Sequence, residues 1–191
     1  MTAEQAGYWL WGVWYVTWWI AAFWADRAAV RPRGAGIVDR LVTGVGVLIL
    51  FWFPVLRSGP LGALAPLWTA EPYANWALVA GIAASFAFCW WARIHMGRLW
   101  SGLVTAKPDH YIVDTGPFRL VRHPIYSGAI SAAFCLALIK ATPAALVGAL
   151  MILIGFWMTA RKEERFLREQ LGAEAYDAYS RETPMFFSLP R

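Results

Sequence analysis

Residues 125–160, IYSGAISAAFCLALIKATPAALVGALMILIGFWMTA, decide the fold of this chain. The run is 36 residues long and almost entirely apolar, whereas one helix needs only about 20 residues to cross a bilayer. Lys140, Thr142 and Pro143 interrupt it near the middle, and proline is favoured in the first turn of a helix. The run therefore predicts two short or tilted transmembrane helices that form a hairpin, with Lys140 reaching water at the turn.

The whole chain has the composition of an integral membrane protein. Apolar residues make up 59% of its 191 residues and charged residues only 15%, and the mean hydropathy is positive. It also has 13 tryptophans, whose indole rings favour the interface between bilayer and water. We therefore expect an all-α integral membrane protein, with residues 1–191 forming a single membrane domain.

Three further apolar runs precede the hairpin, at residues 8–25, 41–56 and 74–92. Loops rich in charge, glycine or proline separate them, as is typical of connections between helices. Together with the hairpin, these runs predict about five transmembrane helices. Three lie in the N-terminal part, residues 1–92, and two in the part that follows, residues 93–191.

The chain beyond the hairpin begins as an amphipathic helix. Phe166, Leu167 and Leu171 recur at helical spacing among charged residues. Gly172 follows them, and glycine commonly ends a helix. We expect this helix to lie on the cytoplasmic surface of the membrane.

The distribution of basic residues predicts the orientation of the chain. With five spans, fifteen Lys and Arg residues fall on the side of the C-terminus, and only two, Arg57 and Lys140, fall on the other side. Because cytoplasmic loops carry the excess of Lys and Arg, we expect the N-terminus outside and the C-terminus in the cytoplasm, in a bacterial inner membrane. No basic region or small-residue cleavage site marks the first apolar run as a removed signal peptide.

The sequence disfavours several other classes of partner and function. The basic residues form short blocks between apolar runs, which indicates contact with membrane lipids and not with nucleic acid. Cys89 and Cys135 each lie inside an apolar run with no partner at ligand spacing, so we expect neither a disulfide framework nor a metal site. No charged residue lies deep in a span, as an ion-coupled transporter would require.

Most side chains capable of chemistry lie in residues 110–128, HYIVDTGPFRLVRHPIYSG, and in residues 161–164. A tight hairpin brings its entry close to its exit, and the side chains at these two ends are Arg122, His123 and Tyr126, then Arg161, Glu163 and Glu164. Basic groups, an imidazole, a phenol and two carboxylates on one face suit a zwitterionic ligand. Taken singly, such residues are also typical of topological anchors, a helix cap or a solvated helix face.

The order and spacing of these residues resemble the isoprenylcysteine carboxyl methyltransferases and their bacterial relatives, which in turn resemble the membrane phospholipid methyltransferases. The resemblance covers residues 110–187 and rests on two blocks in the family's order. The matching positions are His110, Val113, Gly116, Arg122, His123, Pro124, Tyr126 and Gly128, then Glu163, Glu164, Leu167, Gly172, Tyr176, Tyr179 and Pro184.

The resemblance implies methyl transfer from S-adenosylmethionine inside a membrane enclosure, without a Rossmann domain. The chain agrees in lacking a glycine-rich dinucleotide fingerprint after a strand. The cofactor-binding residues that the resemblance implies are His110, Ile112, Val113 and Gly116 for the nucleoside and backbone contacts, Arg122, His123 and Tyr126 for the aminoacyl end, and Glu163, which with Glu164 closes the pocket. The candidate catalytic residues are Glu163, Glu164 and Arg161, so residues 93–191 form the expected catalytic region.

Two positions depart from the family pattern and bear on the acceptor. Phe118 stands where the family usually has Tyr. Thr159 stands where carboxyl-methylating members have Arg, and Arg161 lies about 200° further around a helix. The identity of the methyl acceptor therefore remains open: it is a lipophilic or amphiphilic molecule with a carboxylate, thiol or amine. One alternative for the protein is a phospholipid or amine N-methyltransferase. A non-catalytic membrane scaffold or lipid-binding protein is the alternative of another class.

Overall fold

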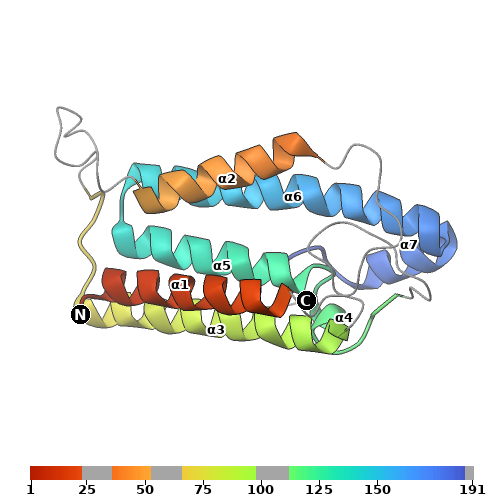
Figure 1. Cartoon of the computed structure of the whole chain (residues 1–191), viewed down its shortest axis with the longest axis horizontal. Coiled ribbons are helices and arrows are strands. Elements are labelled where there is room, and N and C mark those ends of the chain that lie inside the picture. The colour runs from red at the N-terminus through yellow and green to blue at the C-terminus, as the bar shows by residue number, and fades with distance from the viewer. Residues whose placement is uncertain (23–35, 53–65, 98–111, 188–191) are drawn as a thin grey trace.

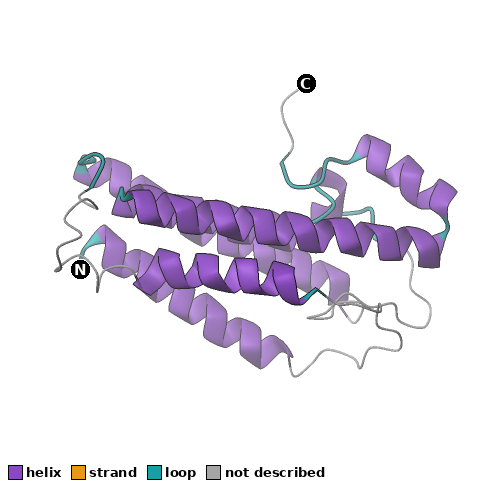
Figure 2. Ribbon diagram, turned by 90° about the horizontal axis from the view of Figure 1, so that it is seen from above, coloured by secondary structure: helices purple, strands orange, loops and turns teal. Residues whose placement is uncertain are grey.

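The computed structural model describes residues 1–22, 36–52, 66–97 and 112–187. These residues form helices joined by turns and short extended segments, and no strand occurs among them (Figure 2). The helices are α1 (Ala3–Ala22), α2 (Ile37–Trp52), α3 (Pro72–Met96), α4 (Pro117–Leu120), α5 (Pro124–Lys140), α6 (Pro143–Leu171) and α7 (Ala173–Glu182). The predicted all-α class is thus confirmed for the described chain.

Local sequence sets the bounds of the longest helix. Thr142 caps α6, because its hydroxyl accepts a hydrogen bond from the Ala145 N–H at 3.2 Å, and Pro143 occupies the first turn. Ala141 adopts the left-handed conformation, with φ of 53°, and ends α5. Gly172 ends α6 with φ of 94°. The predicted roles of Pro143 and Gly172 are confirmed. The expectation that Lys140 reaches water is wrong, because Lys140 is buried and its ammonium donates to the carbonyl of Leu50 in α2.

The five long helices lie side by side along one axis (Figure 1). Helices α2 and α6 pack together on one side, α1 and α3 on the other, and α5 lies between them in contact with α1, α3 and α6. Consecutive long helices run in opposite directions, so the end of α3, the start of α5 and the far part of α6 meet at one end of the bundle, where α4 and α7 also lie (Figure 1). This end holds the residues of the candidate site.

Small and branched apolar residues fill the space between the helices. The fully buried core residues include Leu50 of α2, Ile82 of α3, Leu136 of α5 and Ile152 of α6. Aromatic rings of α1 complete this core, and Trp14 stacks on Phe86 at 4.8 Å between ring centroids. The core therefore joins all five long helices and holds the site end in a fixed shape.

Two helices, α3 and α6, are long and apolar enough to cross a membrane, and α5 is a shorter apolar helix. The described parts of all five predicted apolar runs are helical. The amphipathic segment expected after the hairpin is not a separate helix, since α6 continues through residues 161–171 without a break. No glycine or proline lies between residues 156 and 171 to end it earlier.

Candidate active site

The centre of the candidate site is an ion pair between the segment just before α5 and the far part of α6. The Nε of Arg122 lies 2.8 Å from Oε1 of Glu164, and the two side chains are only 11% and 14% exposed. The same carboxylate oxygen lies 3.1 Å from Nε2 of His123, which is also buried. One carboxylate thus receives hydrogen bonds from the two residues that directly precede α5.

The second carboxylate of α6 faces the phenol of Tyr126. The Tyr126 hydroxyl donates to Oε2 of Glu163 at 3.0 Å, and Nδ1 of His123 lies 3.7 Å from the same oxygen. The rings of His123 and Tyr126 stack with an interplanar angle of 7°, since residues three apart share one side of a helix. Tyr126 also stacks on Phe156, at 4.8 Å between centroids. The imidazole of His123 therefore lies between the carboxylates of Glu163 and Glu164.

Residues 183–187, here called the C-terminal strap, cover this cluster. The backbone N–H groups of Arg122 and His123 donate to the carbonyls of Pro184 and Met185, at 2.9 and 3.1 Å. The guanidinium of Arg122 also donates to the carbonyl of Thr183, and Phe186 is buried with its ring centroid 6.0 Å from that of His123. The strap thus closes the cluster by pairing with the residues that open α5.

Charge and burial set the protonation of the groups around the strap. Burial raises the pKa of Glu164, but the hydrogen bonds from His123 and Arg122 outweigh it, so the net pKa is below its usual range. Burial, reinforced by the negative charge of Glu164, raises the pKa of the buried Tyr176 of α7. At neutral pH the cluster therefore holds an ionised Glu164 beside a neutral phenol.

Gly116, directly before α4, lies against His95 at the end of α3. Gly116 has φ of 57°, and a Cβ at this position would lie 2.7–2.9 Å from the ring of His95, which itself lies 2.9 Å from the Thr115 hydroxyl oxygen. Only glycine combines this backbone conformation with such close contact. Further along, the hydroxyl of Tyr179 donates to the carbonyl of Phe118 at 2.7 Å and ties α7 to α4.

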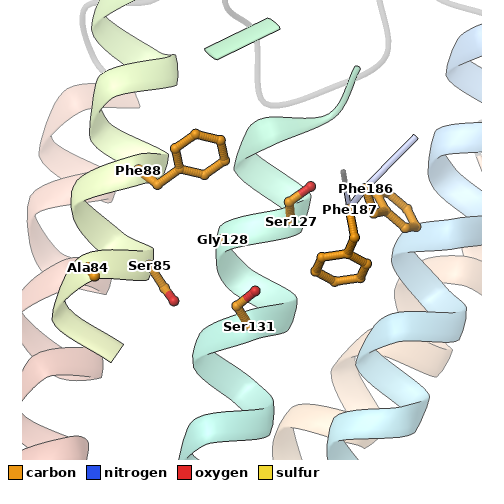
Figure 3. A pocket seen from close by; sticks show the side chains of 8 residues that line it. All are labelled: Ala84, Ser85, Phe88, Ser127, Gly128, Ser131, Phe186 and Phe187. Carbon is orange, nitrogen blue, oxygen red and sulfur yellow. The ribbon is translucent and has the colours of Figure 1, made fainter. Parts of the chain in front are cut away.

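A cavity of about 340 Å³ lies between α3, α5 and the strap (Figure 3). Phe186 lines this cavity and also lies against the His123 ring, so the cavity adjoins the carboxylate cluster. The lining residues are Ala84, Ser85 and Phe88 of α3, Ser127, Gly128 and Ser131 of α5, and Phe186 and Phe187 at the end of the strap. The cavity wall is thus aromatic and small apolar, with three hydroxyl groups.

Comparison with known proteins finds one family that resembles part of the chain. Residues 77–169, just under half of the chain, match the isoprenylcysteine carboxyl methyltransferase (ICMT) family. This part of the chain is therefore similar to that family. The match runs from within α3 to the far part of α6, and so includes both halves of the carboxylate cluster.

Two curated relatives are metal resistance proteins by name. Cobalt-zinc-cadmium resistance protein CzcN of Cupriavidus metallidurans is 31% identical over 94 residues, and nickel-cobalt-cadmium resistance protein NccN of Alcaligenes xylosoxydans xylosoxydans is 31% identical over 102 residues. Each alignment covers 48% of this chain and 43% of the relative. The chain therefore spans less than half the length of the curated relatives it matches.

The structure brings together five of the residues that the ICMT resemblance singled out: Arg122, His123, Tyr126, Glu163 and Glu164. Arg161 is not among them, because its side chain is exposed and its guanidinium lies over the ring of Trp157, 5.8 Å from the centroid. Ile112 and Val113 are half-buried in the extended segment before α4. His110 lies outside the described residues.

Sequence reasoning missed a second polar cluster, between α2 and α6. The carboxylate of Asp39 accepts hydrogen bonds from the Thr159 hydroxyl at 3.0 Å and from the Lys162 ammonium at 3.2 Å. Thr159 and Lys162 are three residues apart and so share one side of α6. That spacing, together with the single acidic residue Asp39 just before the second apolar run, was the signal available in the sequence. Sequence reasoning also missed the strap and the cavity, which no sequence motif marks.

Proposed function

We propose that this protein is an S-adenosylmethionine-dependent methyltransferase of the ICMT family in the bacterial inner membrane. Its acceptor is a lipophilic or small amphiphilic molecule that offers a carboxylate, thiol or amine. The similarity of residues 77–169 to the ICMT family and the apolar helices α3 and α6 support this reading. The observation that carries it is the gathering of Arg122, His123, Tyr126 and two carboxylates under the strap.

The charges of this cluster fit the cofactor. S-adenosylmethionine carries a carboxylate, an ammonium and a sulfonium, so it needs both hydrogen-bond donors and negative charge. Glu163 is 28% exposed, and its Oε1 accepts no hydrogen bond from any described residue. Glu163 therefore has the free capacity to bind a cation, while Glu164 is already engaged by Arg122 and His123. The resemblance implies Arg122 and His123 as donors for the carboxylate end, and the Nη2 of Arg122 has no hydrogen-bond partner among the described residues.

The bound cofactor supplies an activated methyl group, and the protein residues supply alignment and exclusion of water. Tyr126 and His123 hold the Glu163 side chain, so its free oxygen has a fixed direction. For an amine acceptor, this oxygen can take the proton that the nucleophile loses. That free carboxylate oxygen favours an amine or phospholipid N-methyltransferase as the second candidate. Arg161 stays a catalytic candidate from the sequence alone.

We further propose five membrane spans, α1, α2, α3, α5 and α6, with α5 and α6 as a transmembrane hairpin. The alternating directions of these helices support the odd number, because the N-terminus and the site then lie at opposite ends of the bundle (Figure 1). The excess of Lys and Arg supports a cytoplasmic site and an N-terminus outside. On this arrangement the acceptor enters laterally from the bilayer, and its apolar part occupies the cavity beside Ser127 and Phe186.

Calorimetric titration with S-adenosylhomocysteine tests the proposal without knowledge of the acceptor. We expect micromolar binding to the detergent-purified protein, weakened about ten-fold or more in Glu163→Gln because a charge-assisted hydrogen bond is lost. The control is Arg168→Ala, which removes an exposed residue paired with Asp177 and should leave binding unchanged. Absence of binding in well-folded protein would refute the enzyme reading and favour a non-catalytic scaffold or lipid-binding protein.

A further inference from the structure

The polar cluster between α2 and α6 is built around a buried carboxylate. Asp39 lies in the first turn of α2, and its residue is only 3% exposed. Each of its oxygens has a partner on α6, one the Thr159 hydroxyl and the other the Lys162 ammonium. The Thr159 hydroxyl also lies 3.0 Å from the carbonyl oxygen of Gly155, so its one hydrogen is shared between this carbonyl and Asp39. The acceptor capacity of the Asp39 carboxylate is therefore directed toward α6.

The exposed part of this cluster is the Lys162 ammonium, which has more N–H donors than hydrogen-bond partners among the described residues. The Lys162 side chain is 33% exposed, and Asp39 is the one hydrogen-bond partner that the described residues give it. An ammonium has three N–H donors, so two remain for a ligand. Because Asp39 holds Nζ, these donors do not move freely as they would on an unpaired surface lysine. The result is an oriented positive charge.

The main chain is shaped to allow this pair. A Cβ on Gly36, the residue before α2, would lie 1.8 Å from Oδ1 of Asp39 and 2.0 Å from Nζ of Lys162. A side chain there would displace the ends of both side chains, so glycine leaves room for the pair as it lies in the structure. Two separate parts of the chain, residues 36–39 and 159–162, thus contribute to one small site.

The end of the bundle that holds Lys162 has the exposed residues expected at the boundary between lipid chains and headgroups. Ile37 and Leu41 on the first turns of α2 are 73% and 60% exposed, and Trp157 on α6 is 49% exposed. Trp157 carries the guanidinium of Arg161 on its ring, and Trp with Arg is typical of the membrane interface. By helix geometry these side chains point away from the contact between α2 and α6, so they mark the level of Lys162 in the membrane and do not line its site.

We propose that Lys162, positioned by Asp39 and Thr159, binds the phosphate of an anionic phospholipid whose acyl chains lie along α2 and α6. A lysine ammonium acts on phosphate as a point charge, and basic residues at this level attract anionic lipids. The site lies on the α2 side of α6, whereas the cavity lies between α3, α5 and the strap. It is therefore distinct from the acceptor cavity and does not depend on the proposed enzyme activity.

Native mass spectrometry of the detergent-purified chain, titrated with phosphatidylglycerol or phosphatidylcholine, measures the binding. The parent should bind phosphatidylglycerol more tightly, and Lys162→Met should weaken that binding about five-fold without affecting phosphatidylcholine. Arg165→Met removes one charge from an exposed residue three positions along α6 and should change the affinity less than about two-fold. Glycerol 1-phosphate, offered in place of the lipid, should bind no variant.

The Asp39→Asn variant distinguishes binding by an oriented Lys162 ammonium from nonspecific electrostatic attraction to the lipid. This change makes the protein more positive by one charge, so simple attraction would tighten phosphatidylglycerol binding. The proposal expects weaker binding, since Lys162 loses the group that positions it. Thr159→Val, which leaves all charges in place, should weaken binding in the same direction, and thermal melting confirms that each variant is folded. Unchanged binding in Lys162→Met, tighter binding in Asp39→Asn, or equal binding of glycerol 1-phosphate would each overturn the proposal.

Discussion

Replacement of Glu164 by glutamine tests how the carboxylate cluster holds the site end together. Glu164 accepts hydrogen bonds from Arg122 at 2.8 Å and His123 at 3.1 Å, and it is mostly buried. Hydrogen bonds to charged groups contribute about 1.5–3 kcal/mol each, and loss of one partner of a buried pair costs about 3–5 kcal/mol. Arg122 keeps its strap carbonyl, and glutamine keeps one acceptor oxygen. We therefore expect a loss of about 2–3 kcal/mol in the free energy of unfolding.

The neighbouring Glu163→Gln is a matched control with the opposite expected profile. Glu163 is more exposed, and its hydrogen bond comes from the neutral Tyr126 hydroxyl, which an amide oxygen can still accept. Glu163→Gln should therefore lower the free energy of unfolding by at most about 1 kcal/mol. Cofactor binding should instead fall, because Glu163 carries the free carboxylate oxygen. One residue of the pair thus serves stability and the other serves binding.

Unfolding by sodium dodecyl sulfate in mixed micelles gives the free-energy differences, and calorimetry with S-adenosylhomocysteine gives the affinities. The reasoning fails if Glu164→Gln costs less than about 0.5 kcal/mol, or if the two variants lose equal stability. It also fails if Glu163→Gln binds the ligand as tightly as the parent.

Three further expectations follow from the same geometry. The folded pKa of Glu164 is below its ordinary value of 4.5. Glu164 therefore contributes its full stabilisation above pH 4.5, and this stabilisation is lost as the pH falls through the folded pKa. Melting curves of Glu164→Gln in acid should depend less on pH than those of the parent. Gly116→Ala should destabilise the fold by about 1–3 kcal/mol, because it forces a left-handed residue against the His95 ring; thermal melting that matches the parent would contradict this. Ser131→Trp should fill the cavity and abolish transfer of labelled methyl to lipid extracts while S-adenosylhomocysteine still binds; full transfer would exclude the cavity as the acceptor site.

The placement of the helices along the chain was predictable because apolar length and helix-ending residues act locally. The described parts of the five apolar runs are helical, and α6 begins at Pro143 and ends before Gly172 as expected. The meeting of Arg122 with Glu164 was predictable too, since two antiparallel helices joined by a short turn bring the entry of one beside the exit of the other. These features need only chain order and helix geometry.

The choice of which side of each helix faces which neighbour was not predictable in this way. Arg161 and Lys162 are adjacent in sequence, yet one lies over Trp157 and the other pairs with Asp39, because neighbours on a helix differ by about 100° in direction. Helix α5 is apolar on all sides, so its periodicity does not indicate which side meets α3 and which meets α6.

The sequence by itself therefore determined the class of the protein, the order of its helices and the residues capable of chemistry at one end. Only the tertiary structure decided that the strap closes over His123, that Glu163 keeps a free oxygen while Glu164 does not, and that Asp39 meets Thr159 across 120 residues of chain. The physical reason is that local patterns act within one helix, whereas these contacts depend on the rotation and packing of several helices against one another.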